Sequence, residues 1–157
     1  MEENCIFCKI VKGVAPCYKV YEDEHVLAFL DINPLMEGHT LVIPKEHYVT
    51  LDQVPGELAG ACMAVVPKLA RALMEATGTC GWNILQNNGR VAGQEVFHVH
   101  FHVVPRKRGD SLSSTWCGWR VDALKKTEGE RLSLAVQQAL LDRSEKNEAE
   151  GKTETKK

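Results

Sequence analysis

Histidine and apolar residues alternate in one stretch of the chain, Phe97-His98-Val99-His100-Phe101-His102-Val103-Val104. In a β-strand, residues two apart point to the same face, so the three histidines share one face and the apolar residues share the other. A helix would instead place the three imidazoles at about 0°, 200° and 40° around its axis. The spacing therefore predicts a strand from Val96 to Val104 that presents three imidazoles together.

The sequence on either side of this stretch predicts the rest of an antiparallel sheet. Short apolar or branched runs bounded by Gly, Pro and polar residues predict strands over 18–21, 26–30, 39–43 and 81–86. The apolar period becomes helical from Pro55 to Thr77, where Pro67 predicts a kink or a junction of two helices. We expect an α+β fold with an antiparallel sheet, one long helix, and short N-terminal and C-terminal helices, the last over 132–141.

The chain has 157 residues and a formal net charge of −2, which suits a single domain. We expect this domain to span 1–142, with a core over 5–106 and an extension over 107–142. The charged stretch 143–157 is expected to be a disordered polar tail. No apolar run approaches the ~20 residues of a membrane helix. The near-neutral charge argues against binding of nucleic acid or of anionic membranes over a broad surface.

The six cysteines are expected to be reduced, because the opening residues lack the basic and then apolar stretch of a secretory signal. This predicts a cytoplasmic or nuclear protein. Cys5 and Cys8 have the spacing of half a zinc site. A Cys2His2 set that uses His47 and one histidine of the 98–102 stretch would fix the N-terminus against the sheet. It would also leave two histidines of that stretch for chemistry.

Two chemistries compete for the alternating histidines. Imidazoles two apart on a strand can chelate one metal ion with an open position for water, which is a common design among hydrolases. Alternatively, a neutral imidazole can act as a nucleophile toward phosphorus, since its reference pKa of about 6.5 leaves it mostly unprotonated at pH 7. The pattern alone leaves both open.

The alternating stretch resembles the defining motif of the histidine-triad (HIT) superfamily, and we call His98, His100 and His102 the triad. Three further stretches resemble the same family in the same order, namely Cys5–Ile10, Leu27–Pro34 and Gly38–Lys45. The agreement runs from about Cys5 to Arg106. The best fit is the Hint-like branch of small nucleotide hydrolases, whose members keep a zinc site and form homodimers.

The resemblance implies a role for each histidine of the site. His100 would attack the α-phosphorus of a nucleotide and become nucleotidylated, and water would then release the nucleoside monophosphate. His102 would contact the phosphate or the leaving group, and His39 would help to orient the nucleophile. Asp31 would hold the ribose hydroxyls.

The resemblance also implies the remaining contacts. The base would lie against Ile6, Phe7, Ile10, Phe29, Leu30 and Ile32. The phosphates would lie along Asn87, Gly93, Gln94 and Glu95, where backbone N–H groups at Gly93 and Gln94 are expected to stabilise charge. Structural zinc would be bound by Cys5, Cys8, His47 and His98.

Two features depart from the family pattern. Many relatives have serine or threonine at the position of Glu95. A carboxylate near phosphate is unfavourable unless it is protonated or turned away, so the backbone N–H of Glu95 is expected to serve there instead. The segment 106–142 is longer than the shortest relatives need, and Trp116 and Trp119 are expected near the site or across a dimer.

The expected function is hydrolysis of nucleoside phosphoramidates or related nucleotidyl conjugates, with AMP-like purine nucleotides as the favoured substrates. We expect neither an organic cofactor nor specific binding of nucleic acid. A dinucleoside polyphosphate hydrolase of the same superfamily is the nearest alternative. From other classes, a metal-dependent hydrolase with the triad as ligands and a nucleotide-binding module without turnover stay open.

Overall fold

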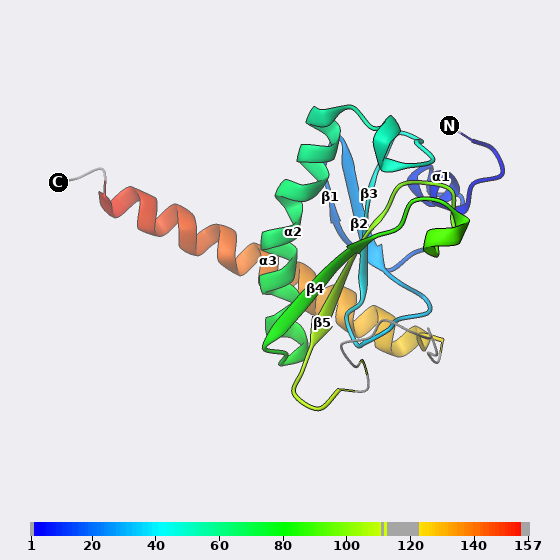
Figure 1. Ribbon diagram of the computed structural model, residues 1–157. Helices are drawn as coiled ribbons and strands as arrows, with labels where there is room; N and C mark the ends of the chain where they lie inside the picture. Colours follow the sequence, from blue (N-terminus) through cyan, green and yellow to red (C-terminus); the bar gives the residue numbers. More distant parts are fainter. Residues whose placement is uncertain (1, 111, 113–122, 155–157) are drawn as a thin grey trace.

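The fold is a single five-stranded antiparallel sheet with helices on both faces, as the computed structural model shows for residues 2–110, 112 and 123–154 (Figure 1). The spatial order of the strands is β1-β2-β3-β5-β4. Their bounds are β1 Lys19–Glu22, β2 Val26–Leu30, β3 Thr40–Pro44, β4 Gly81–Gln86 and β5 Phe101–Arg106. The helices are α1 Ile6–Val11, α2 Gly56–Thr77 and α3 Lys126–Glu154, with short 3₁₀ turns at Leu51–Gln53 and Arg90–Ala92. The expected α+β class and the antiparallel sheet are confirmed.

The two faces of the sheet carry separate apolar clusters, which explains why β2 and β3 are apolar at every position. Val26, Ala28 and Leu30 pack with α2 and α3 in the larger cluster. Leu27 and Phe29 face the other way and pack in the cluster that includes Phe7 of α1. Because both faces are covered, all residues of these strands are buried, and the period-two alternation of a half-exposed strand is lost.

The strand that carries the triad is shorter than predicted, because β5 begins at Phe101 rather than at Val96. Before that residue the backbone leaves the sheet: the Val99 N–H donates to the carbonyl of Tyr48, and the His98 N–H donates back to the carbonyl of Val96. Val99 and Phe101 still pack in the larger cluster. His102 is therefore a strand residue, whereas His98 lies in a bend and His100 lies in the short segment that leads into the strand.

The helix α2 is continuous through Pro67, and Gly78 ends it in the left-handed conformation with a φ of 64°. The predicted junction of two helices at Pro67 is therefore wrong. In the part of the chain that the structure describes, no helix has both the length and the apolarity that a membrane span requires.

The C-terminal helix differs most from the prediction. α3 spans 29 residues, so it is neither short nor confined to 132–141. Leu132 and Val136 are fully buried against the sheet. The helix continues to Glu154 through much of the stretch expected to be disordered, and this part extends away from the domain (Figure 1). Glu and Lys, which recur in this stretch, are strong helix formers.

Candidate functional site

A cavity of about 670 Å³ lies between α1, the end of β2 and the approach to β5. Of the residues predicted to contact a nucleotide, it is lined by Ile6, Phe7, Ile10, Phe29, Leu30, Asp31, Ile32, Gly93 and Glu95. His100 and His102 line it as well. Sequence reasoning missed Ala15, Pro16, Cys17, Asn33, Leu41 and Val96. Segment 15–17 approaches the cavity only because the chain folds back after α1, and no local pattern indicates this.

Two residues predicted to lie along the phosphates are not part of the cavity lining. Gln94 is buried, and its side chain ties three backbone segments together. Its Oε1 accepts the Gly89 N–H at 2.7 Å, and its amide donates to the carbonyls of Val49 at 2.6 Å and Val96 at 3.1 Å. Asn87 donates to the carbonyl of Gly93 at 3.5 Å. Both side chains thus support the loop instead of reaching into the cavity.

The backbone groups expected to stabilise phosphate are also differently placed. The Gly93 N–H donates to the carbonyl of Arg90, and the Gln94 N–H donates to that of Gly89. Both donors are used within the turn around the 3₁₀ segment, and their role toward a phosphate stays a prediction. The Glu95 N–H, by contrast, forms no hydrogen bond within the described residues.

Hydrogen bonds fix the tautomers of three neutral imidazoles. The Leu35 N–H donates to Nδ1 of His39 at 3.1 Å, so His39 carries its proton on Nε2 and donates to Nδ1 of His102 at 2.9 Å. His102 must then carry its own proton on Nε2. Nδ1 of His100 lies 2.7 Å from the carbonyl of His98 and can only donate to it, which leaves a lone pair on Nε2 of His100. The site thus presents one nucleophilic nitrogen and one N–H donor.

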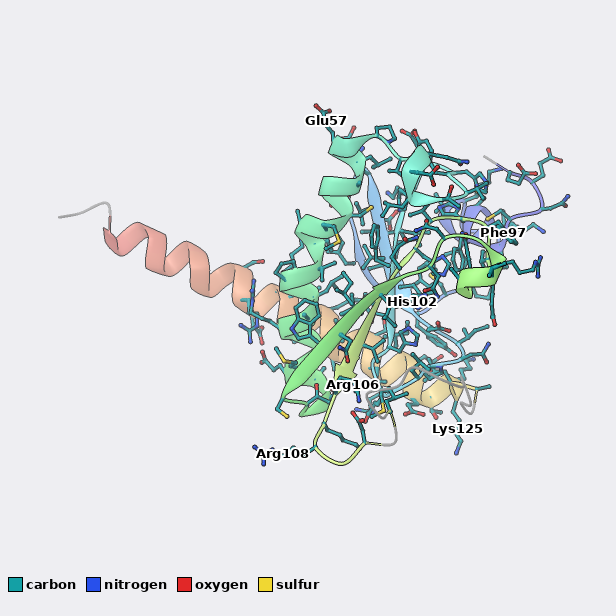
Figure 2. The ribbon with its side chains drawn as sticks, viewed as in Figure 1. Glu57, Phe97, His102, Arg106, Arg108 and Lys125 are labelled. Atoms are coloured by element: carbon teal, nitrogen blue, oxygen red, sulfur yellow. The ribbon has the colours of Figure 1, made fainter. Side chains whose placement is uncertain are left out.

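Burial keeps these imidazoles uncharged. Desolvation lowers the pKa of His39 and of His102 to about 3, and the neighbouring imidazoles act in the same direction. Figure 2 shows His102 in the interior of the domain, in contrast to Glu57 and Lys125 at its periphery. Burial also lowers the pKa of His100. Because His39 is neutral, the 3.7 Å separation between its Nδ1 and Oδ2 of Asp31 is not an ion pair.

Two further contacts position the edges of the site. Asp31 accepts the Asn33 N–H at 2.8 Å, and burial raises the pKa of its carboxyl. The ring of Phe7 stands edge-on to those of His100 and Phe29, each at 5.4 Å between centroids. α1 therefore packs directly against the ring of His100.

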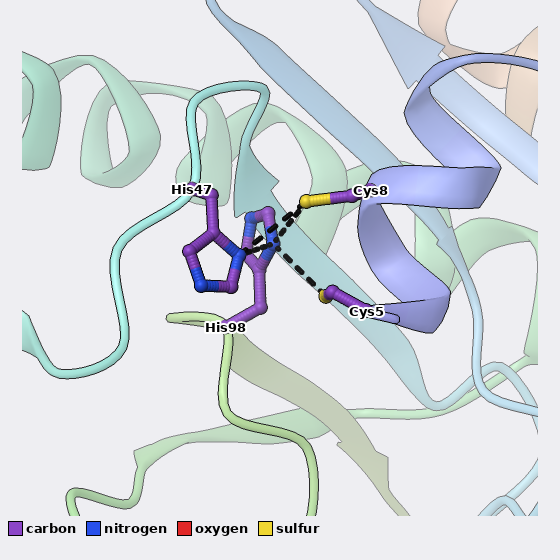
Figure 3. Close-up of side chains that lie close together, drawn as sticks. All are labelled: Cys5, Cys8, His47 and His98. Carbon is purple, nitrogen blue, oxygen red and sulfur yellow. Dashed lines mark hydrogen bonds between the residues drawn. The ribbon is translucent and has the colours of Figure 1, made fainter. Parts of the chain in front are cut away.

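Cys5, Cys8, His47 and His98 converge beside the cavity (Figure 3). Nδ1 of His98 lies 3.6 Å from each sulfur and 3.3 Å from Nδ1 of His47, which is 3.4 Å from Sγ of Cys8. A tetrahedral zinc ion with bonds of about 2.05 Å to nitrogen and 2.3 Å to sulfur separates two nitrogens by about 3.3 Å, and a nitrogen from a sulfur by about 3.6 Å. The donor set and its spacing fit zinc.

The second nitrogen of His98 supports the same assignment. Nε2 lies 2.9 Å from the carbonyl of Pro44 and donates to it, so Nδ1 keeps its lone pair for a metal. The predicted ligand set is thus brought together by three separate elements, namely α1, the loop after β3 and the approach to β5.

The triad does not form a common metal site. Within the described residues, a second group of metal-ligating atoms comprises Asp31, His39 and His102, and it includes neither of the other triad members. In that group, Nδ1 of His39 already accepts a backbone N–H and its Nε2 donates to His102. The three triad imidazoles have three different hydrogen-bond partners, and this arrangement disfavours the hydrolase that would use them as metal ligands.

The fold and the site together define a class: an α+β domain with a neutral imidazole at the lining of a 670 Å³ cavity and a separate Cys2His2 cluster. The HIT domain family matches residues 12–109. The chain belongs to this family, in its Hint-like branch.

Relatives support this placement along most of the chain. Adenylylsulfatase HINT3 of Arabidopsis thaliana is 44% identical over 126 residues, which are 80% of this chain but 61% of that protein. Adenosine 5'-monophosphoramidase hnt1 of Schizosaccharomyces pombe is 42% identical over 135 residues, which are 85% of this chain and 98% of that protein. A Zn-bound histidine triad family protein from Mycobacterium smegmatis is similar in structure, with a TM-score of 0.76 and 45% identity over 90% of this chain and 97% of that one.

Trp116 and Trp119, predicted near the site or across a dimer, lie outside the described residues.

Proposed function

We propose that this protein hydrolyses adenosine 5'-phosphoramidates and related nucleotidyl conjugates at the α-phosphate and releases the nucleoside monophosphate. The observation that carries the proposal is the bond from Nδ1 of His100 to the carbonyl of His98, because it leaves the other ring nitrogen as a lone-pair donor in the cavity lining. Relatives named for adenylylsulfatase and phosphoramidase activity are each 44% identical to this chain, over 126 and 119 residues.

In the first step, Nε2 of His100 attacks the phosphorus. The bond from phosphorus to the amine breaks, its electron pair leaves with the nitrogen, and the amine takes a proton from solvent. His102 holds its Nε2–H toward a phosphate oxygen, and His39 fixes that tautomer through the 2.9 Å bond. In the second step, water attacks the phosphorus and loses a proton to solvent. The bond from phosphorus to Nε2 of His100 breaks, its electron pair returns to Nε2, and the nucleoside monophosphate leaves.

The nucleotide is oriented by groups on either side of the phosphorus. The apolar wall of Ile6, Phe7, Ile10, Phe29, Leu30 and Ile32 takes a purine base. Asp31, at the end of β2, accepts hydrogen bonds from the ribose hydroxyls. The N–H of Glu95, which has no partner among the described residues, is the backbone donor for the phosphate.

Zinc is the metal that Cys5, Cys8, His47 and His98 hold. Four protein ligands would close the site, so a bound ion would have a structural role and would leave no open position for water. By fixing His98, the cluster also fixes the carbonyl that accepts the proton of His100. Thiolate ligands require reduced cysteines, in keeping with a protein of the cytoplasm or nucleus.

The protein assembles as a homodimer through β4. This strand is at one edge of the sheet, and Trp82 and Ile84 on it are 38% and 36% exposed. An edge with large apolar side chains is suited to pairing with the same strand of a second copy.

The test is turnover of adenosine 5'-phosphoramidate by the wild type and by His100→Asn, with His25→Asn as a matched surface control. We expect His100→Asn to lower kcat by at least ~10³-fold while nucleotide binding persists. Rapid quench followed by mass spectrometry should detect a nucleotidyl adduct on His100 of the wild type. Undiminished turnover by His100→Asn would exclude the mechanism, and a wild type that binds AMP without any turnover would identify a binding module instead.

A further inference from the structure

The helix α1 is too short to keep its position by itself. It has six residues, and Cys5 at its N-cap forms no side-chain capping bond. Isolated helices shorter than about 12 residues are marginal in water, because forming the first turn is costly. The position of α1 therefore depends on its contacts with the rest of the domain.

Two of these contacts come from the Cys2His2 cluster. Figure 3 shows Cys5 and Cys8, at the start and in the first turn of α1, beside His47 and His98. The two histidines belong to the loop after β3 and to the segment before β5. A metal ion held by all four side chains would therefore attach α1 to both of these segments.

Phe7 lies between the two cysteines in the sequence, and its side chain is buried. The centroid of its ring is 5.9 Å from that of His98, which is a member of the cluster. The same ring is 5.4 Å from that of His100, and it also lines the cavity. One side chain thus contacts both the cluster and the proposed site of catalysis.

The cavity depends on α1 for half of the apolar wall proposed for the base. Ile6, Phe7 and Ile10 are the wall residues that this helix contributes. Ile6 directly follows Cys5, and Phe7 directly precedes Cys8. Any change in the position of the two cysteines therefore also moves this part of the wall.

We propose that Phe7 is a positioning residue that couples the Cys2His2 cluster to the cavity, so that zinc and nucleotide raise each other's affinity. This inference rests on the proposed function, because it takes the cavity as the nucleotide site. Bound zinc fixes the cysteines relative to His98, and the ring of Phe7 extends this order to His100 and to the wall. A nucleotide that packs against the wall requires the same order, so the ligand that binds first lowers the ordering cost of the second.

The coupling has a defined size and works in both directions. By thermodynamic linkage, zinc must change the affinity for nucleotide by the same factor as nucleotide changes the affinity for zinc. Such factors are typically about 5- to 150-fold. Only half of the wall belongs to α1, so we expect a factor toward the lower end of this range, of about 10-fold.

The experiment measures this factor from both directions, with AMP as the probe. Calorimetry gives the AMP affinity of the zinc-loaded and the zinc-free protein, and competition with a chelator gives the zinc affinity at increasing AMP concentration. Both should give a factor of about 10-fold, and the second should reach a plateau once AMP saturates the cavity. The competition starts from the zinc-loaded protein, so it can be carried out even if the zinc-free chain unfolds. In that case the factor would keep rising with AMP concentration, which would overturn a local coupling through Phe7.

Two variants test whether Phe7 carries the coupling. Phe7→Leu keeps an apolar side chain at the wall but removes the ring, so the factor should fall below about 2-fold. Ile32→Ala is the matched control, because Ile32 lines the same cavity from the loop after β2. It should weaken AMP binding equally with and without zinc and keep the wild-type factor.

An equal factor in the wild type and in Phe7→Leu would overturn the assignment, as would an AMP affinity that zinc does not change. Either result leaves the proposed function intact, because the zinc-loaded protein still binds AMP. A zinc-loaded wild type that does not bind AMP would instead refute the proposed function, and this inference with it.

Discussion

His39 and His102 form a buried pair of neutral imidazoles, and acid should destabilise the fold through them. The pKa of each is near 3 in the folded protein, against an ordinary value of 6.5. Between pH 3 and 6.5, the unfolded chain therefore binds more protons at these two positions than the folded protein does. Stability falls as the pH falls through this window, by about 1.4 kcal/mol per pH unit for each imidazole.

The magnitude between pH 7 and pH 5 follows from the same values. Over that interval, each imidazole lowers the free energy of unfolding by about 2 kcal/mol, because it becomes protonated in the unfolded chain but stays neutral in the folded protein. Two titratable neighbours of the pair among the described residues are Asp31, whose Oδ2 lies 3.7 Å from Nδ1 of His39, and His100, whose ring centroid lies 4.8 Å from that of His102. His102→Gln removes one titrating group while its side-chain oxygen can still accept the proton of His39.

The assay is urea denaturation of the wild type and of His102→Gln at pH 7, 6 and 5, with zinc present throughout. The wild type should lose about 2 kcal/mol more free energy of unfolding than the variant between pH 7 and pH 5. Both proteins have the same Cys2His2 cluster, so loss of metal in acid cancels in this difference. His25→Gln, which changes an exposed histidine, should lose as much as the wild type. Equal losses in the wild type and in His102→Gln would refute the reasoning.

Two further predictions concern the metal and the assembly. Cys8→Ser should lower the bound zinc, measured by elemental analysis, from one equivalent per chain to near zero, and should lower the Tm measured by calorimetry. The control variant Cys80→Ser should retain the metal. Zinc retained by Cys8→Ser would exclude the proposed ligand set. Trp82→Asp should shift the protein from dimer to monomer in sedimentation, because it places a charge on the exposed edge strand; a dimer that persists with unchanged affinity would exclude β4 as the interface.

Local patterns determined most of the architecture. The periodicity of apolar residues identified β2, β3, β4 and α2 to within a residue or two. Burial of one face of a strand or helix requires that periodicity regardless of the rest of the fold. The spacing of Cys5 and Cys8 likewise indicated half of a metal site, since two thiolates of one helical turn can reach the same ion.

Other features depended on neighbours that local sequence does not specify. Gln94 looked like a phosphate contact, yet its amide holds the carbonyls of Val49 and Val96. The triad looked like one continuous strand, but Val99 bonds to Tyr48 instead of continuing the ladder. In each case a contact between distant segments satisfied a buried polar group, and this requirement outweighed the local preference.

The sequence by itself therefore determined that three histidines alternate with core residues and that two cysteines stand one helical turn apart. Only the tertiary structure decided which partner each of the three histidines contacts. Folding turns His98 toward Cys5 and Cys8, points the proton of His100 at a carbonyl, and buries His102 against His39. The physical reason is that the tautomer of an imidazole is set by the partner that each ring nitrogen meets, and the partners of His98 and His102 come from distant parts of the chain.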